Sequence, residues 1–177
     1  MSSALVRRPR PVLAAAAALA LVLGACARAR PGPRLHVEWI GADTGRFSGP
    51  ATASWCPVAR RLEVRGVKDD LGFGLVVYPE SLLVPGEYPV FDPGIDTVHR
   101  PGSAGAARWF TEQIVAGFQS DSGGVQVLES GAAVRLRFGF RMRSLTGEDT
   151  LRAEGEATRL VPGACSADSV PNSAPIQ

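Results

Sequence analysis

Residues 134 to 143 alternate without a break between apolar side chains and residues that are arginine or glycine. The apolar set is Val134, Leu136, Phe138, Phe140 and Met142. Because successive side chains of a β-strand point to opposite faces of a sheet, one face of this segment belongs to a core and the other faces water. No helical period fits it. The sequence predicts a hairpin in which residues 144–149 turn and residues 151–157 form the returning strand.

A hydrophobic period close to two continues through most of the chain. It is clear over residues 35–39, 62–64 and 73–77, and residues 106–118, which would also fit a helical stripe, are interpreted as strand. Residues 121–124 are expected to bend into a strand over 125–128. Further turn signals lie at Gly45, Gly49-Pro50, Asp69-Asp70, Pro85-Gly86 and Pro93-Gly94. The spacing predicts an all-β fold, an antiparallel β-sandwich or partly open barrel of short strands.

The first 25 residues have the order of an export signal. Arg7, Arg8 and Arg10 precede an uninterrupted apolar run over residues 12–23, and the segment contains no acidic residue. The run is shorter than the roughly 20 residues that a transmembrane helix needs. We therefore expect residues 1–25 to be an N-terminal signal helix that is removed during export.

Cys26 follows this run in the segment Leu23-Gly24-Ala25-Cys26, which resembles the bacterial lipobox. The resemblance implies cleavage before Cys26 and attachment of diacylglycerol to its sulfur, with palmitate among the acyl chains. The alternative is an ordinary secreted protein with a cysteine near its cleavage site. Ala27 stands where an aspartate would favour the inner membrane, so the resemblance implies the outer membrane in a host that has two.

This interpretation divides the chain into four parts. Residues 1–25 are the signal peptide, and residues 26–33 are the lipidated cysteine and a tether with two prolines. Residues 34–165 form the β-sandwich domain, and residues 166–177 are expected to be a disordered tail. Removing 3 of the 19 basic residues and none of the 17 acidic ones leaves a formal net charge of −1. This balance offers no general attraction to nucleic acid.

The three cysteines support the same division. An exported protein with an odd number of thiols needs an explanation for one of them, and lipidation of Cys26 supplies it. Cys56 and Cys165 then remain, and an oxidising compartment favours a disulfide between them. The alternative is that both are small buried apolar residues.

Arg135, Arg137, Arg141 and Arg143 share the solvent-facing side of the 134–143 strand. Guanidinium groups bind phosphates and other anions through paired donors, so these residues are a candidate anion-binding face. The favoured alternative is structural, because Glu154 and Glu156 belong to the same outer face of the predicted hairpin. Opposite charges on neighbouring strands commonly stabilise a sheet.

Catalytic and metal-binding patterns are weak. Asp121-Ser122-Gly123-Gly124 resembles the nucleophile segment of chymotrypsin-like serine proteases, but His36 and His99 lack the local context of that family, and Ser122 is interpreted as a turn residue. Zinc-ligand spacing is missing, and Asp69-Asp70 offers too few oxygen ligands for calcium. We expect no cofactor, no metal and no catalytic residue, although catalytic residues can also converge from distant loops without forming a local motif.

Several short segments resemble the strand and turn sequences of uncharacterised all-β bacterial envelope lipoproteins. They are Gly45-Arg-Phe-Ser-Gly49, Pro85-Gly-Glu-Tyr88, Ser122-Gly-Gly-Val125 and Phe138-Gly-Phe140. The resemblance spans most of the chain beyond Cys26 at loose spacing. It implies a shared sandwich-like fold and no particular activity.

Three functions remain. The leading hypothesis is a non-catalytic binding or structural module held on a membrane by its lipid, with an envelope protein or a glycan as partner. The second is a carrier of an apolar ligand, suggested by the aromatic residues Trp39, Trp55, Trp109, Phe138 and Phe140, for which core packing is the commoner role. The third is a hydrolase that uses Ser122, Asp121 or His99.

Overall fold

The computed structural model describes residues 32–91, 100–110 and 115–165, and these residues form an all-β domain. Within those ranges no helix is long and apolar enough to cross a membrane. The predicted signal helix, residues 26–31 of the tether, Pro93-Gly94 and residues 166–177 lie outside the described residues.

The described residues form eleven strands. They are β1 (Arg34–Gly41), β2 (Gly45–Pro50), β3 (Thr52–Cys56), β4 (Arg61–Lys68), β5 (Leu71–Tyr78), β6 (Gly86–Pro89), β7 (Gly102–Phe110), β8 (Val115–Ser130), β9 (Val134–Ser144), β10 (Thr150–Leu160) and β11 (Gly163–Ala164).

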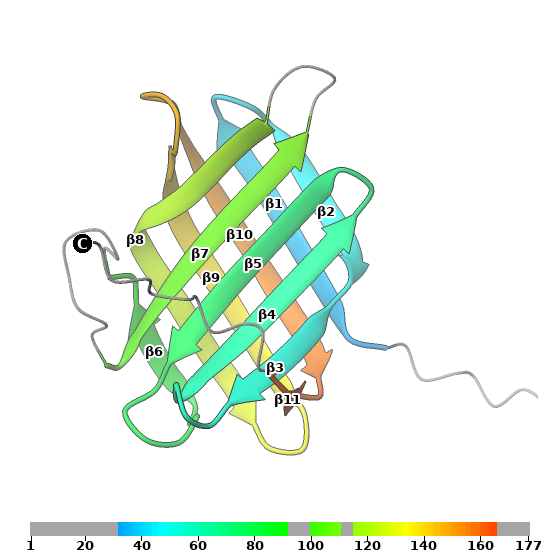
Figure 1. Cartoon of the computed structure of the whole chain (residues 1–177), viewed down its shortest axis with the longest axis vertical. Coiled ribbons are helices and arrows are strands. Elements are labelled where there is room, and N and C mark those ends of the chain that lie inside the picture. The colour runs from blue at the N-terminus through cyan, green and yellow to red at the C-terminus, as the bar shows by residue number, and fades with distance from the viewer. Residues whose placement is uncertain (1–31, 92–99, 111–114, 166–177) are drawn as a thin grey trace, which may run out of the picture. The chain divides into compact units, whose positions relative to one another are not determined.

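All strands belong to one sheet, in the order β11-β3-β4-β5-β7-β8-β9-β10-β1-β2, with β6 paired to β8. Neighbours are antiparallel except β11, which runs parallel to β3. Figure 1 shows the sheet curling over, so that β4, β5 and β7 face β9, β10 and β1. The single curled sheet corresponds to the open-barrel alternative of the prediction.

β8 carries the sheet around its bend. Its first residues pair with β7, its later ones pair with β6, and β9 follows it from Phe118 to Ser130. The register shifts between Ser120 and Ser122, and Gly123 has a φ of +103°. Such a bulge bends a strand and increases its twist. The prediction that residues 121–124 are a bend between strands was therefore wrong, because a bulge lets one long strand turn without ending.

The two ends of the sheet meet without forming a continuous hydrogen-bonded ladder. β2 lies at one edge and β3 near the other, and a single residue, Ala51, links them. A Cβ added at Gly66 of β4 would lie 2.7 Å from the Phe47 ring of β2. Side-chain packing therefore covers the open side of the curled sheet. The turn predicted at Gly49-Pro50 was wrong, because both residues pair with β1 as the end of β2, and the chain crosses at Ala51.

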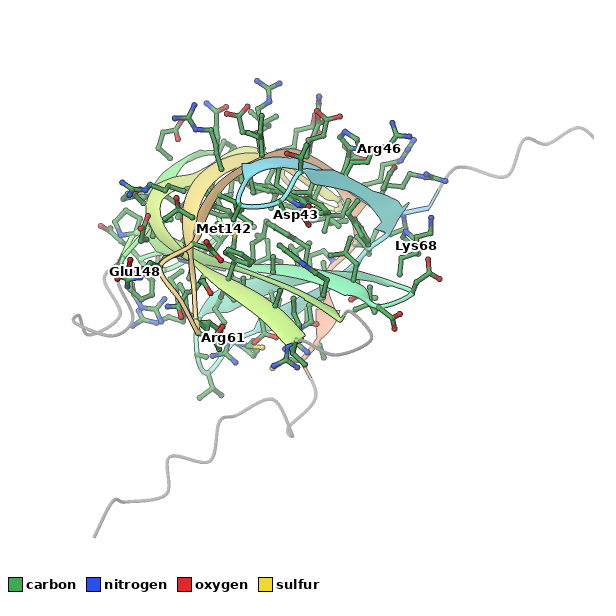
Figure 2. The ribbon with its side chains drawn as sticks, turned by 90° about the horizontal axis from the view of Figure 1, so that it is seen from above. Asp43, Arg46, Arg61, Lys68, Met142 and Glu148 are labelled. Carbon is green, nitrogen blue, oxygen red and sulfur yellow. The ribbon has the colours of Figure 1, made fainter. Side chains whose placement is uncertain are left out.

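The inner face of the sheet is the hydrophobic core. Alternating residues of every long strand point inward, including Leu62 and Val64 of β4 and Leu136 of β9. Phe138 stacks on Phe73 and on Phe140, with ring centroids 5.3 Å apart in each pair. Figure 2 shows side chains filling the space enclosed by the curved ribbon while others radiate outward.

The predicted hairpin is confirmed. β9 and β10 pair from Arg143 opposite Thr150 to Leu136 opposite Ala157, with a turn between Ser144 and Thr150. Asp69-Asp70 forms the turn between β4 and β5, as expected. The expectation of short strands was wrong in part, because β8 has 16 residues and β9 and β10 have 11 each.

Candidate functional site

The outer face of the sheet differs between its two halves. Over β9, β10 and β1 it carries charged side chains, among them Arg137, Glu154 and Glu38. Over β5 and β7 it carries small ones, among them Gly74 and Ala106. The core occupies the inner face, so a binding site has to be sought on these outer surfaces.

The candidate arginines of β9 lie on the outer face as the alternation requires. Arg135 donates from Nε to Glu156 Oε1 at 2.7 Å, and this hydrogen bond, together with the charge of Glu156, raises the pKa of the guanidinium. The Nε atom of Arg141 lies 3.9 Å from Oδ2 of Asp121. This arrangement favours the structural interpretation for these two residues.

Arg137 and Arg143 are exposed, and each has its own neighbours on the adjacent strands. Arg137 faces Glu156 on β10 and Gln126 on β8. Arg143 faces Thr150 and Gln119. Arg141 stands opposite Arg152 rather than opposite a glutamate, so the four arginines of β9 do not all have an acidic cross-strand neighbour.

Arg137 belongs to a groove of about 780 Å³ across the outer face of β1, β10, β9, β8 and β6. Its charged walls are formed by one arginine and four glutamates, together with His36. The glutamates are Glu38, Glu87, Glu154 and Glu156. Glycines form much of its floor, namely Gly123, Gly124, Gly139 and Gly155. We call this the acid-rich groove.

Glu38 and Glu154 are directly opposite each other on β1 and β10. Like charges in that position destabilise a sheet. Arg46 lies on the other side of Glu38 in the β2 register, and the ion pair that Glu38 makes is with His36 at 3.4 Å, which requires a protonated imidazole. Within the described parts of the chain, Glu87 and Glu154 form no ion pair. Glu156 is paired with Arg135, so the charge that the described part of the fold leaves without an ion pair lies on Glu87 and Glu154.

A second groove, of about 560 Å³, follows β5 and β7 on the other half of the sheet. Gly74, Val76, Ala104 and Ala106 line its floor, and Leu145 stands at one wall. A Cβ added at Gly74 would fit without a clash, since its nearest atom would be the Val64 carbonyl oxygen at 3.7 Å. The floor is smooth and nearly uncharged, in contrast to the acid-rich groove.

The opposite wall of this second groove is an ion cluster on β4. Glu63 is only 6% exposed, and its two oxygens contact Arg61 at 2.6 Å and Arg65 at 2.7 Å. Burial pulls the pKa of Arg61 down, but Glu63 offsets this, and the net effect raises that pKa. In this cluster one buried carboxylate is shared by two arginines, which makes it a structural element of the β4 surface.

Cys56 and Cys165 lie beside this cluster, and both are thiols in this structure. Cys56 is buried at the end of β3, and Cys165 follows β11, the strand that pairs with β3. Burial raises the pKa of Cys56, and a hydrogen bond with Cys165 and the charge of Glu63 raise it further. A thiol of this kind is a poor nucleophile, because the thiolate is the reactive form.

The remaining sequence candidates do not converge. The Ser122 hydroxyl donates to Asp121 at 3.0 Å within β8, whereas His36 lies on β1 beside Glu38, and His99 lies outside the described residues. In the described ranges no group of three or more histidine, cysteine or acidic residues is placed to hold a metal ion.

The five aromatic residues proposed for a carrier are part of the packing. Phe138 and Phe140 are buried in the core, and Trp39, Trp55 and Trp109 pack against it. Trp109 stacks between Trp39 and Phe118, with ring centroids 5.5 and 5.0 Å apart.

The acid-rich groove was not anticipated from the sequence. Its glutamates were visible as outward-facing residues of the alternating segments, but the groove depends on β1 lying beside β10, about 115 residues later in the chain. Only the pairing of β1 with β10 reveals that Glu38 faces Glu154. No protein-family model matches the chain, and neither does any curated protein or solved structure.

Proposed function

We propose that this chain is a lipid-anchored module of the bacterial cell envelope, and that it binds a basic partner through the acid-rich groove. Export and lipidation at Cys26 are the interpretation of residues 1–26, and the outer membrane is the destination that Ala27 favours. The partner is a lysine- or arginine-rich segment of an envelope protein.

The observation that carries the proposal is the unneutralised charge in a preformed groove. Four glutamates and one arginine line the groove, and Glu156 is paired with Arg135 outside it. Of the other three glutamates, Glu38 and Glu154 oppose each other across the β1–β10 pair. Such a pair costs stability in the free domain, and a cationic side chain placed between the carboxylates would remove that cost. The groove's volume is within the roughly 300 to 1,000 Å³ that is usual for binding sites.

Binding of an apolar ligand inside the domain is less well supported. The space enclosed by the curled sheet is occupied by core residues such as Phe73, Phe138 and Met142. A carrier would have to move these side chains, and well-packed cores resist such changes.

A photoreactive amino acid at Gln126, in the groove, tests the proposal in intact envelopes. We expect it to capture an envelope protein, and the yield to fall roughly tenfold, equivalent to about 1.4 kcal/mol, in a Glu38→Gln/Glu154→Gln variant. The matched control is Glu80→Gln/Glu148→Gln, which removes the same charge from exposed residues outside the groove.

Capture that is equally strong in the groove variant would refute the assignment of this surface. So would capture that falls equally in both double variants, since that result would indicate an effect of net charge alone.

A further inference from the structure

β11 continues the sheet beyond β3 at the edge of the fold. Gly163 pairs with Ser54 and Ala164 pairs with Trp55 in a parallel register. One further step places Cys165 opposite Cys56, and the Cys165 amide donates to the Trp55 carbonyl at 3.3 Å. Neighbouring strands are about 4.8 Å apart, which is within the roughly 4.4 to 6.8 Å between Cα atoms that a disulfide spans.

The Cys56 end of this pair is held by the loop that follows it. Arg100 donates to the carbonyl oxygens of Ala59, Arg60 and Pro79 at 2.6 to 2.8 Å, and its guanidinium lies 5.5 Å from the centre of the Tyr78 ring. These contacts fix the connection between β3 and β4. The position of the Cys56 end of the pair is therefore set independently of β11.

We propose that Cys56 and Cys165 form a disulfide that fastens β11 to the edge strand β3. The oxidant is a protein or small-molecule disulfide of the export compartment. Its two sulfurs take up two electrons and two protons and leave as thiols, while one S–S bond forms between Cys56 and Cys165.

The order of the exchange follows from exposure. Cys165 is half-buried and Cys56 is buried, so the oxidant meets Cys165 first and forms a mixed disulfide with it. Cys56, already in contact with Cys165, then attacks the Cys165 sulfur and expels the second thiol. Burial holds the pKa of Cys56 above its ordinary value, so this step depends on the contact between the two sulfurs and not on a large thiolate fraction.

The bond would stabilise a part of the fold that has few other attachments. β11 has two residues, and among the described strands they pair with β3 alone. An edge strand with unpaired backbone groups is a site for unwanted pairing with another chain. Holding β11 in place covers that edge.

The full chain, purified from membranes and alkylated under denaturing conditions before and after reduction, provides the test. We expect Cys56 and Cys165 to be alkylated only after reduction, and unreduced digests to contain a peptide joining the two. The peptide that contains Cys26 reports lipidation separately, so a failure of the anchor would not be mistaken for a failure of the disulfide.

The melting temperature of the domain provides a second test of the disulfide. The variant is Cys165→Ser, because Cys165 is the less buried of the two cysteines. Reductant should lower the Tm of the natural chain by on the order of 10 °C, to that of Cys165→Ser, and should leave the variant unchanged. Alkylation of both cysteines without reduction would overturn the proposal. So would a Tm of the natural chain that does not change when reductant is added.

Discussion

Glu63 is a carboxylate on the outer face of β4, yet it is as buried as a core residue. Arg61 and Arg65, two positions away on either side, both contact it, and only Arg65 is well exposed. Removing one partner from a buried ion pair leaves an uncompensated charge, which costs more than the pair contributes. The stability of this part of the sheet therefore depends on Glu63 more than on its exposed partner.

Glu63→Gln should lower the free energy of unfolding by on the order of 3 kcal/mol, because Arg61 and Arg65 would both lose the buried carboxylate that they share. Arg65→Gln should cost less than about 1 kcal/mol, since an exposed ion pair contributes little. Urea denaturation of the two variants measures the difference. Equal losses in both would contradict the account of this cluster.

The alternation of β4 predicts correctly that Glu63 points away from the core. It does not predict that Glu63 is buried, because burial comes from its two arginines and from neighbouring strands. Similarly, the sequence suggested pairing of Cys56 with Cys165 by elimination, but their contact depends on β11 reaching β3 across more than a hundred residues.

At the scale of elements, the open side of the sheet is closed by packing between β2 and β4. Phe47 occupies the position that a side chain at Gly66 would need, and a Cβ there would also lie 2.9 Å from Leu35. Gly66 is thus required by a close approach, whereas Gly74 on the neighbouring strand is not.

Gly66→Ala should destabilise the domain by about 1 to 3 kcal/mol, as overpacking of a core does. Gly74→Ala should be neutral or stabilising by up to about 1 kcal/mol, because the added Cβ would meet its nearest atom at 3.7 Å without a clash and the unfolded chain loses entropy. Thermal unfolding of the two variants distinguishes these outcomes. A neutral Gly66→Ala variant would show that Phe47 does not hold the sheet closed.

The prediction of strands was best where one face of the strand packs in the core and the other faces solvent, as in β9 and β10. β2 and β3 were missed because they are short and rich in glycine, proline and small residues. The length of β8 was missed because its bulge contains Asp, Ser and Gly, which are the residues that also make turns.

At the scale of the whole molecule, all-β character followed from the period of two, but the choice between a sandwich and an open barrel did not. The choice depends on which edges of the sheet lie next to each other. Here the single residue Ala51 between β2 and β3 brings the two ends of one sheet together. The acid-rich groove is likewise a product of non-local pairing, so its residues could be named as outward-facing but not as neighbours.

The anchor at Cys26 is the claim on which the proposed function depends most. Mass spectrometry of the chain recovered from bacterial membranes tests it directly. We predict an N-terminal residue Cys26 whose sulfur carries diacylglycerol, with residues 1–25 removed. A mature chain that begins at another residue, or a Cys26 thiol free of lipid, would contradict the account.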